Sequence, residues 1–293
     1  MWLATNLLSR TVVGFVLGLS LATSTLADTP TEVLSDAVAR IEDRLDGRVG
    51  IALVDTGTGF SWQHRVEERF LMNSIVKAPL CGVVLARRDA GILSLADELP
   101  VRDVDLLEYA PVAETYVGGN MSISELCFAA VDMSDNTATN LLIDYIGGPQ
   151  AVTDYFISIG DSTSRLDRRE PELNTFAVGD LRDTTTPAAM AKTLDVLLLG
   201  DVLAPESRDQ LAEWMGQGSV TGAFLRKDVP QGWAIFDKSG GGSHTRNIVG
   251  IVAPEGRSPW IVTIFISDAD VDFDTRDAAL QELSAAVMAV IRG

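Results

Sequence analysis

Histidine is almost absent from this 293-residue chain, which contains only His64 and His244. His64 lies in a polar stretch and His244 in a glycine-rich turn, and neither has a metal-ligand spacing with other histidines or with cysteines. We therefore expect no zinc site, no other metal and no cofactor. A serine nucleophile in this chain would depend on lysine or glutamate, rather than on histidine, for proton transfer.

Long apolar runs are also absent beyond the first residues of the chain. Arg10 is the only charge before Asp28, and residues 11–27 form an apolar run with small residues toward its end. This run is short for a membrane span, so we expect an export signal that is cleaved after Ala27. The alternative is an uncleaved membrane anchor. The mature chain, residues 28–293, would be an exported protein, periplasmic or secreted, that does not enter the membrane.

Basic residues are few. The chain has 23 Lys and Arg residues against 41 Asp and Glu residues, a formal charge of −18. Loss of Arg10 with the leader leaves 22 basic residues and a charge of −19. Such a surface does not attract nucleic acid or anionic membranes, so neither is an expected partner. An anionic substrate would need a few local cations to overcome this field.

Cysteine is scarce, with only Cys81 and Cys127 in the chain. In an oxidising compartment we expect them to form one disulfide. The alternative is two buried free thiols that pack as small hydrophobic side chains. A bridge would tie together two helical segments that each carry a serine of interest, Ser74 and Ser134.

The hydrophobic pattern changes twice along the chain. Residues 31–46 have the apolar spacing of an amphipathic helix, and residues 48–53 alternate as a strand whose partner follows a turn at 55–59. From residue 74 to about 212 the pattern is helical. Three β-rich runs, at 233–237, 248–252 and 260–266, then follow and are separated by turns. A helix at 278–292 ends the chain.

We therefore expect an α/β (α+β) fold in which the two ends of the chain share one sheet. Residues 28–68 and 216–293 would form an α/β domain, and residues 69–215 an all-helical domain. A cleft between the two is the natural place for a site.

Ser74 and Lys77 are three residues apart, which places them on one face of a helix. If the serine opens this helix, its hydroxyl lies near the amide-rich end, where the macrodipole favours developing negative charge. The following run, residues 78–86, is almost wholly apolar, so Lys77 is costly to keep charged and suits proton exchange with the serine. Alone, such a pair is usually solvated surface.

Three other polar segments have simple structural explanations when each is taken alone. Ser134-Asp135-Asn136 suits a turn or a helix cap, and residues 165–174 form a charged loop. Lys238-Ser239-Gly240-Gly241 suits the end of a strand, with Arg246 after the next turn.

Together and in this order, the Ser-x-x-Lys, Ser-Asp-Asn and Lys-Ser-Gly segments resemble the signatures of the class A serine β-lactamases. The resemblance covers essentially the whole mature chain and includes four further segments, at 69–70, 108–112, 146–149 and 182–190. It implies the fold shared with DD-peptidases, a five-stranded antiparallel sheet flanked by helices beside an all-helical lobe.

The resemblance implies a catalytic role for five residues. Ser74 would attack the lactam carbonyl and form an acyl-enzyme, with the backbone N–H groups of Ser74 and Gly241 as the oxyanion hole. Lys77 would hydrogen-bond Ser74 and take part in proton transfer, and Ser134 would protonate the departing ring nitrogen. Glu170 would hold the water that hydrolyses the acyl-enzyme. Whether Lys77 or the water on Glu170 is the acylation base stays open.

The resemblance also implies substrate-binding and structural residues. The substrate-binding residues would be Tyr109, Asn136, Asn174, Lys238, Ser239 and Arg246. Of these, Lys238, Ser239 and Arg246 would bind the substrate carboxylate. The structural residues would be the two cysteines, a cis Glu170–Pro171 bond, and an Arg168–Asp183 ion pair that clasps the loop.

Four departures from the family pattern stand out. Arg169 replaces a common aromatic residue, Leu71 replaces a frequent proline, and Pro79 lies inside the helix of the nucleophile, where it would remove an interior hydrogen bond. The hairpin at 242–246 is one residue short, which weakens the match of Arg246. No departure removes a catalytic functional group.

We expect a monomeric hydrolase of small penicillin-type β-lactams that confers antibiotic resistance. One alternative is a penicillin-binding DD-peptidase, which would not need Glu170 with Asn174. Another is a sensor that is acylated and stays acylated.

Overall fold

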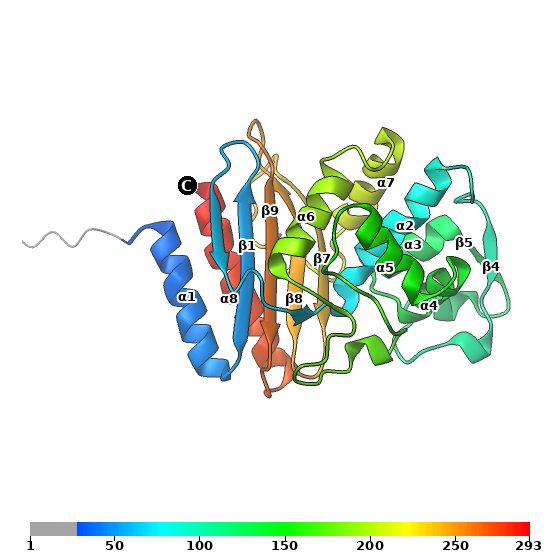
Figure 1. Cartoon of the computed structure of the whole chain (residues 1–293), viewed down its shortest axis with the longest axis horizontal. Coiled ribbons are helices and arrows are strands. Elements are labelled where there is room, and N and C mark those ends of the chain that lie inside the picture. Colours follow the sequence, from blue (N-terminus) through cyan, green and yellow to red (C-terminus); the bar gives the residue numbers. More distant parts are fainter. Residues whose placement is uncertain (1–27) are drawn as a thin grey trace, which may run out of the picture.

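The computed structural model describes residues 28–293, so the predicted export signal, residues 1–27, lies outside the described residues. A five-stranded antiparallel sheet in the order β2-β1-β9-β8-β7 runs through the molecule (Figure 1). Its strands are β1 (Arg48–Asp55), β2 (Ser61–His64), β7 (Ala234–Gly241), β8 (Arg246–Ala253) and β9 (Trp260–Ser267). The predicted α+β fold, with one sheet built from both ends of the chain, is confirmed.

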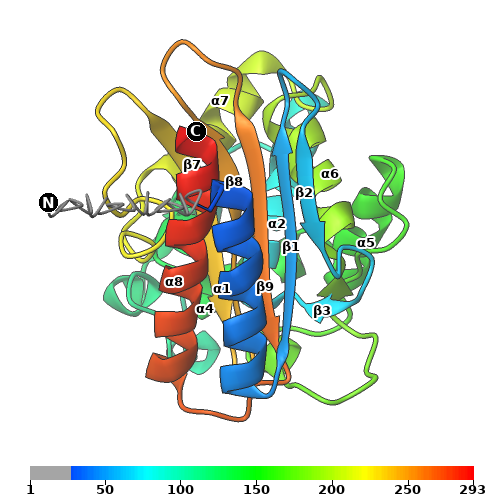
Figure 2. The same ribbon diagram turned by 90° about the vertical axis from the view of Figure 1, so that its left-hand side faces the viewer.

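Both faces of the sheet are buried, because successive residues of a strand point to opposite sides. On β8, Ile248 and Val252 pack into the core beneath two helices, whereas Val249 and Ile251 pack into the core shared with the middle of the chain. The two helices lie side by side on the outer face (Figure 2) and are α1 (Pro30–Leu45) and α8 (Phe273–Arg292). Burial on both sides explains why these strands are apolar at consecutive positions.

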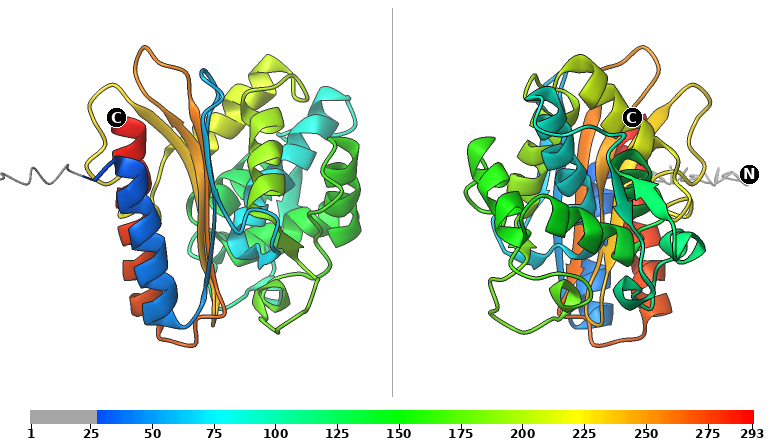
Figure 3. Two further views of the ribbon diagram at one scale, coloured as in Figure 1. Left: turned by 60° about the vertical axis from the view of Figure 1, so that its left-hand side comes forward. Right: turned by 90° about the vertical axis from the view of Figure 1, so that its right-hand side faces the viewer.

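Helices from the middle of the chain cover the opposite face of the sheet (Figure 3). These helices are α2 (Lys77–Asp89), α3 (Ile123–Asp132), α4 (Asn136–Tyr145), α5 (Pro149–Ser158), α6 (Pro187–Leu198) and α7 (Pro205–Gly216). The segments between these helices form two small two-stranded sheets. One pairs β3 (Phe70–Leu71) with β6 (Thr184–Thr185), and the other pairs β4 (Glu98–Pro100) with β5 (Asn120–Ser122). The 3₁₀ turns are η1 (Asn73–Val76), η2 (Asp103–Asp105), η3 (Ala113–Tyr116) and η4 (Glu172–Asn174). Among the described residues, none of these helices combines the length and apolar character needed to span a bilayer.

Ser74 does not open the helix that carries Lys77. Helix α2 starts at Lys77, and Ser74 lies in η1, the turn that leads into it. Pro79 is therefore in the first turn of α2, where backbone N–H groups have no partner within the helix. The expected loss of an interior hydrogen bond at Pro79 does not occur.

The predicted disulfide is wrong, because Cys81 and Cys127 are free thiols in the structure. Both are fully buried, on α2 and α3, and Cys81 Sγ lies 3.8 Å from the carbonyl oxygen of Cys127. Burial raises the pKa of the Cys127 thiol, with the neighbouring Cys81 as the second cause. The two residues pack as small hydrophobic side chains between two helices, which is the alternative that the sequence left open.

Gly250 on β8 lies opposite Asp237 of β7, next to Lys238, where the sheet leaves no room for a side chain. A Cβ at this position would lie 2.4 Å from the carbonyl oxygen of Phe236 and 2.8 Å from Asp237 Cβ. We expect Gly250→Ala to lower the free energy of unfolding by about 1–3 kcal/mol through overpacking. Gly222→Ala is the matched control, since its Cβ would have only the Gly218 carbonyl oxygen nearby, at 3.9 Å. Urea unfolding of both variants checks this, and equal stabilities would contradict it.

Candidate active site

A cleft of about 320 Å³ lies between the edge of the sheet and the helical layer. It is lined by Ser74, Tyr109, Ser134, Asn136, Asn174, Val220, Ser239, Gly240, Gly241, Arg246 and Phe273. Most of the residues predicted from the sequence are therefore gathered in one place. Lys77, Glu170 and Lys238 lie directly beneath this lining and are almost fully buried.

Ser74 lies against strand β7, where glycines allow a close approach. A Cβ on Gly240 would lie 2.9 Å from the carbonyl oxygen of Met72 and 3.0 Å from the backbone nitrogen of Ser74. No larger residue fits there without a shift of the strand or the turn. Gly241 follows on the same strand and lines the cleft together with Ser74.

Lys77 is the centre of the buried polar cluster. Its ammonium donates to the carbonyl oxygen of Ser134 at 2.7 Å and to Asn136 Oδ1 at 2.6 Å, and it lies 3.0 Å from Glu170 Oε1. Burial lowers the pKa of Lys77, whereas the Glu170 carboxylate acts in the opposite direction. Within residues 28–293 the Lys77 ammonium makes no hydrogen bond to Ser74, contrary to the expectation.

The Ser134 hydroxyl lies between two ammonium groups. Its oxygen is 3.0 Å from Lys238 Nζ and 3.3 Å from Lys77 Nζ. Burial lowers the pKa of Lys238 well below its ordinary range, and the nearby charges of Lys77 and Arg246 lower it further. A lysine that is easily deprotonated next to a hydroxyl is suited to relay a proton through that hydroxyl.

Glu170 is held at both its backbone and its carboxylate. Asn140 on α4 donates to the Glu170 carbonyl oxygen at 2.8 Å and accepts from its N–H at 3.0 Å. Asn174 Nδ2 donates to Glu170 Oε2 at 2.5 Å. Oε1 is buried and has the Lys77 ammonium nearby, but no well-aligned hydrogen-bond donor among residues 28–293. The nearest partner of this oxygen is therefore the Lys77 ammonium, at 3.0 Å.

The Glu170 loop, residues 165–183, is closed by ion pairs at its base. Arg168 pairs with Asp183, whose other carboxylate oxygen accepts the backbone N–H groups of Asp167 at 2.7 Å and Arg168 at 2.9 Å. The Glu170–Pro171 bond is cis. Arg169, which departs from the family pattern, is exposed and pairs with Asp144 on α4. This pair adds a contact between the loop and the helical layer.

Arg246 lies in the cleft although its hairpin is short. Its guanidinium pairs with Asp277 of α8, at 2.9 Å from Nε and 2.8 Å from Nη2, and donates to the Gly240 carbonyl oxygen at 3.0 Å. The ring of Phe224 lies 4.8 Å and that of Phe273 4.9 Å from its Cζ. These contacts fix a cation at the end of the cleft that also holds Ser239.

Asp135 connects the Ser-Asp-Asn segment to the mouth of the cleft. One of its oxygens caps α4 by accepting the N–H of Ala138 at 2.8 Å, as the capping interpretation predicts. The other accepts the N–H groups of Val112 at 2.9 Å and Ala113 at 2.8 Å. Tyr109, 48% exposed at the mouth, is thereby kept close to α4.

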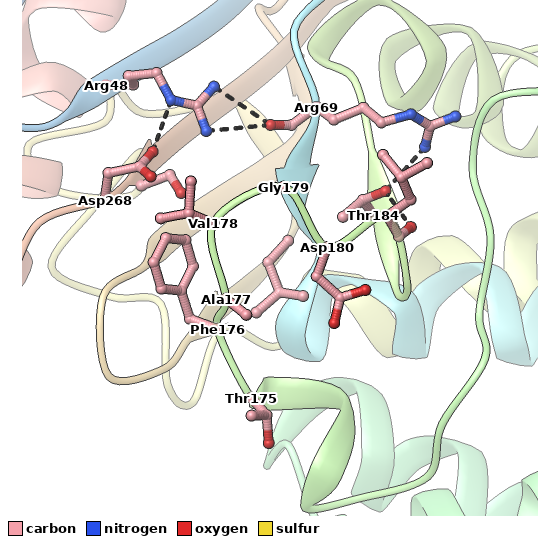
Figure 4. Close-up of a pocket in the computed structure, with 13 residues that line it drawn as sticks. Arg48, Arg69, Thr175, Phe176, Ala177, Val178, Gly179, Asp180, Thr184 and Asp268 are labelled. Atoms are coloured by element: carbon pink, nitrogen blue, oxygen red, sulfur yellow. Dashed lines mark hydrogen bonds and ion pairs between the residues drawn. The ribbon is translucent and has the colours of Figure 1, made fainter.

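A second cavity, of about 230 Å³, lies behind the Glu170 loop (Figure 4). Residues 175–181 of the loop line one side of it, and Arg48, Arg69 and Asp268 line the other. Arg48 pairs with Asp268 at 2.6 Å, and Arg69 donates to Thr184 Oγ1 at 2.9 Å. None of the predicted catalytic residues lines this cavity, so it is the rear of the loop rather than part of the cleft.

The sequence did not reveal several residues that hold the site together. Asn140 and Asp277 act on Glu170 and Arg246 from distant elements, and nothing in their local sequence indicates it. Asn73 contacts Asn174 from the turn that carries Ser74. Within the described residues, 28–293, no cluster of three or more His, Cys, Asp or Glu side chains is arranged to hold a metal ion.

Comparison with known proteins agrees with this site. The sequence matches the model of the β-lactamase enzyme family over residues 33–291. A β-lactamase of Rhodobacter capsulatus is 62% identical over 287 residues, 98% of each chain. β-Lactamase L2 of Stenotrophomonas maltophilia is 42% identical over 267 residues, covering 89% of this chain and 88% of that protein.

Solved structures give the same result. A β-lactamase from Xanthomonas campestris matches with a TM-score of 0.86 and 44% identity, over 89% of this chain and 98% of that one. A class A β-lactamase of the last common ancestor of Gram-negative bacteria matches with a TM-score of 0.85 and 47% identity, over 88% of this chain and 99% of that one. The chain therefore belongs to the β-lactamase enzyme family. Within it, the chain is a class A serine β-lactamase.

Lys238→Met tests how much the buried ammonium group of Lys238 lowers the free energy of unfolding. The folded-state pKa of Lys238 is well below its ordinary value of 10.5, so the folded protein holds this proton less tightly than the unfolded chain does. The charge then costs stability at low pH, and the cost is relieved as the pH rises from the folded-state pKa toward 10.5. We expect Lys238→Met to raise the free energy of unfolding at pH 7 by about 1–3 kcal/mol, with a smaller gain at higher pH.

Urea unfolding at several pH values, with activity measured in parallel, checks this. Lys227→Met, at an exposed position, is the control and should change neither the free energy of unfolding nor the activity. A Lys238→Met variant less stable than the parent at pH 7 would show that the buried charge stabilises the fold.

Proposed function

We propose that this β-lactamase opens the ring of penicillin-type antibiotics through an ester at Ser74, which water held by Glu170 then hydrolyses. The observation that carries the proposal is the contact of Glu170 with both Lys77 and Asn174 beneath the cleft. This contact places a carboxylate next to a proton carrier and gives it a polar partner for orientation. Resistance to these antibiotics follows from their hydrolysis.

Acylation uses the groups around Ser74. The Ser74 hydroxyl attacks the lactam carbonyl, and the backbone N–H groups of Ser74 and Gly241 stabilise the oxyanion. The close packing of β7 against the turn of Ser74 supports this role. Lys77 or a water on Glu170 accepts the serine proton, and Ser134, held by Lys77 and Lys238, donates a proton to the ring nitrogen as the C–N bond breaks.

Deacylation uses Glu170 and Asn174, which belong to the same buried polar cluster as Lys77. Glu170 accepts a proton from water, and the resulting hydroxide attacks the ester carbonyl. The alkoxide of Ser74 leaves and takes up a proton. The contact of Oε1 with Lys77 and the Asn174 amide on Oε2 support this step, because they hold the carboxylate in one orientation beneath the cleft.

Cationic side chains bind the anionic substrate, although the protein as a whole is acidic. Lys238, Ser239 and Arg246 bind the carboxylate of the antibiotic, and Asn136 binds its side-chain amide. Tyr109 lines the mouth of the cleft. The fixed guanidinium of Arg246 supports this assignment, because a pre-organised cation loses little freedom on binding.

Two other functions use part of the same site. A DD-peptidase would need Ser74, Lys77, Ser134 and Lys238 but not Glu170 with Asn174, and a sensor would keep its acyl group. The direct Glu170–Asn174 contact favours hydrolysis over both.

Glu170→Gln separates these functions. We expect a variant that is acylated but releases product at least about 100-fold more slowly, because an amide cannot accept the water proton. Mass spectrometry after incubation with benzylpenicillin should show a persistent adduct. Glu172→Gln, at an exposed position two residues later, is the control and should turn over like the parent. Parent-like turnover of Glu170→Gln would exclude Glu170 as the deacylation base.

We also infer that the protein is exported to the periplasm after cleavage at Ala27 and acts as a monomer. The apolar run at 11–27 supports export. One copy of the chain supplies the predicted residues that line the cleft, which is compatible with a monomer. N-terminal sequencing of the periplasmic protein should start at Asp28. An intact N-terminus in the membrane fraction would favour the anchor instead.

A further inference from the structure

Asn73 directly precedes Ser74 and joins two of the segments that form the cleft. It is fully buried and has a φ of 51°, in the left-handed region. We propose that Asn73 is a positioning residue for deacylation, because its side chain sets the orientation of the Asn174 amide that contacts Glu170. This inference rests on the proposed function of Glu170.

Backbone carbonyls fix the first member of this network. Asn247 Nδ2 donates to the carbonyl oxygens of Leu71 at 2.8 Å and Met72 at 3.2 Å, and to Asn73 Oδ1 at 3.1 Å. Carbonyl oxygens only accept hydrogen bonds, so the Asn247 NH₂ group must face them. Thr245 Oγ1 also donates to Asn73 Oδ1, at 2.8 Å. Asn73 therefore presents its oxygen to β8 and its own NH₂ group to the opposite side.

The opposite side is the Glu170 loop. Asn73 Nδ2 donates to Asn174 Oδ1 at 3.0 Å, and Asn174 Nδ2 donates to Glu170 Oε2 at 2.5 Å. A flipped Asn174 would place two oxygens against each other at Glu170 and two NH₂ groups against each other at Asn73. The hydrogen bonds from β8 to Glu170 thus permit one orientation of Asn174, with a donor toward the carboxylate.

Packing alone does not fix this part of the loop. The cavity behind the loop begins at Thr175, the residue after Asn174 (Figure 4). On the cleft side, Gly242 leaves the space that the contact needs, since a Cβ there would lie 2.9 Å from Asn73 Nδ2 and 3.1 Å from the Asn174 carbonyl oxygen. Asn73 is therefore the side-chain link between Asn174 and the sheet.

Asn73→Gly removes this link and keeps the backbone, because glycine adopts a positive φ without strain. We expect kcat for benzylpenicillin to fall about 10- to 100-fold and KM to fall with it, because deacylation becomes the slow step. The ester at Ser74 should then accumulate and appear in the mass spectrum. The double variant Asn73→Gly/Asn174→Ala should lose no more than Asn174→Ala alone, because Asn73 acts through Asn174.

Asp46→Gly is the matched control, since Asp46 also has a positive φ, 46°, and is exposed at the end of α1. It should leave kcat and KM unchanged. Equal losses in kcat and kcat/KM for Asn73→Gly without an accumulated ester would overturn the proposal, as would parent-like kinetics. If Glu170→Gln traps the ester but Asn73→Gly does not, only the role of Asn73 fails. If Glu170→Gln does not trap it, the proposed function fails.

A second measurement does not require Asn73 to be replaced. In the Glu170→Gln variant the charge at the end of the network is lost, so the side-chain NH₂ resonances of both Asn174 and Asn73 should shift. Asn120, on β5 and paired with Glu98, is the internal reference. A shift confined to Asn174 would show that Asn73 is not coupled to the carboxylate. This result would overturn the proposal even if Asn73→Gly fails to fold.

Discussion

The site depends on keeping two lysine ammonium groups inside the protein, both near the Ser134 hydroxyl. Desolvation of each charge is costly, and the two repel each other. Glu170 is the carboxylate nearest to Lys77, and the Ser134 carbonyl oxygen and Asn136 supply the remaining acceptors for it. The positions of α2, α4 and the Glu170 loop are therefore coupled, because each supplies a partner that the buried charge requires.

The fold brings these partners together by layering the middle of the chain on a sheet built from its two ends. Strand β7 lies at the edge of the sheet, so its glycines at 240 and 241 can approach the turn of Ser74 directly. The helices of the middle segment cover one face of the sheet and carry Lys77, Asn136 and Asn140 toward that edge. The cleft lies between this edge of the sheet and the helical layer.

Much of this arrangement could be predicted from the sequence, because several residues act through local patterns. Asp135 caps a helix, as a Ser-Asp-Asn turn before an apolar run suggests. Other features depend on distant contacts that no local pattern reveals. Asn140 reaches the Glu170 backbone across 30 positions of sequence, and Asp277 reaches Arg246 from the last helix. The disulfide was predicted wrongly, and Ser74 lies in η1 instead of opening α2, since both features depend on packing around η1 and between α2 and α3.

The two ends of the described chain lie next to each other. Helix α1 begins, and α8 ends, at the same end of the outer face (Figure 2), and Arg40 and Arg44 of α1 pair with Glu282 of α8. The same arrangement of helices and strands is therefore compatible with a different order of these elements along the polypeptide. A short peptide could join Gly293 to Asp28, and new ends could open in an exposed loop, while every layer of the molecule stayed in place.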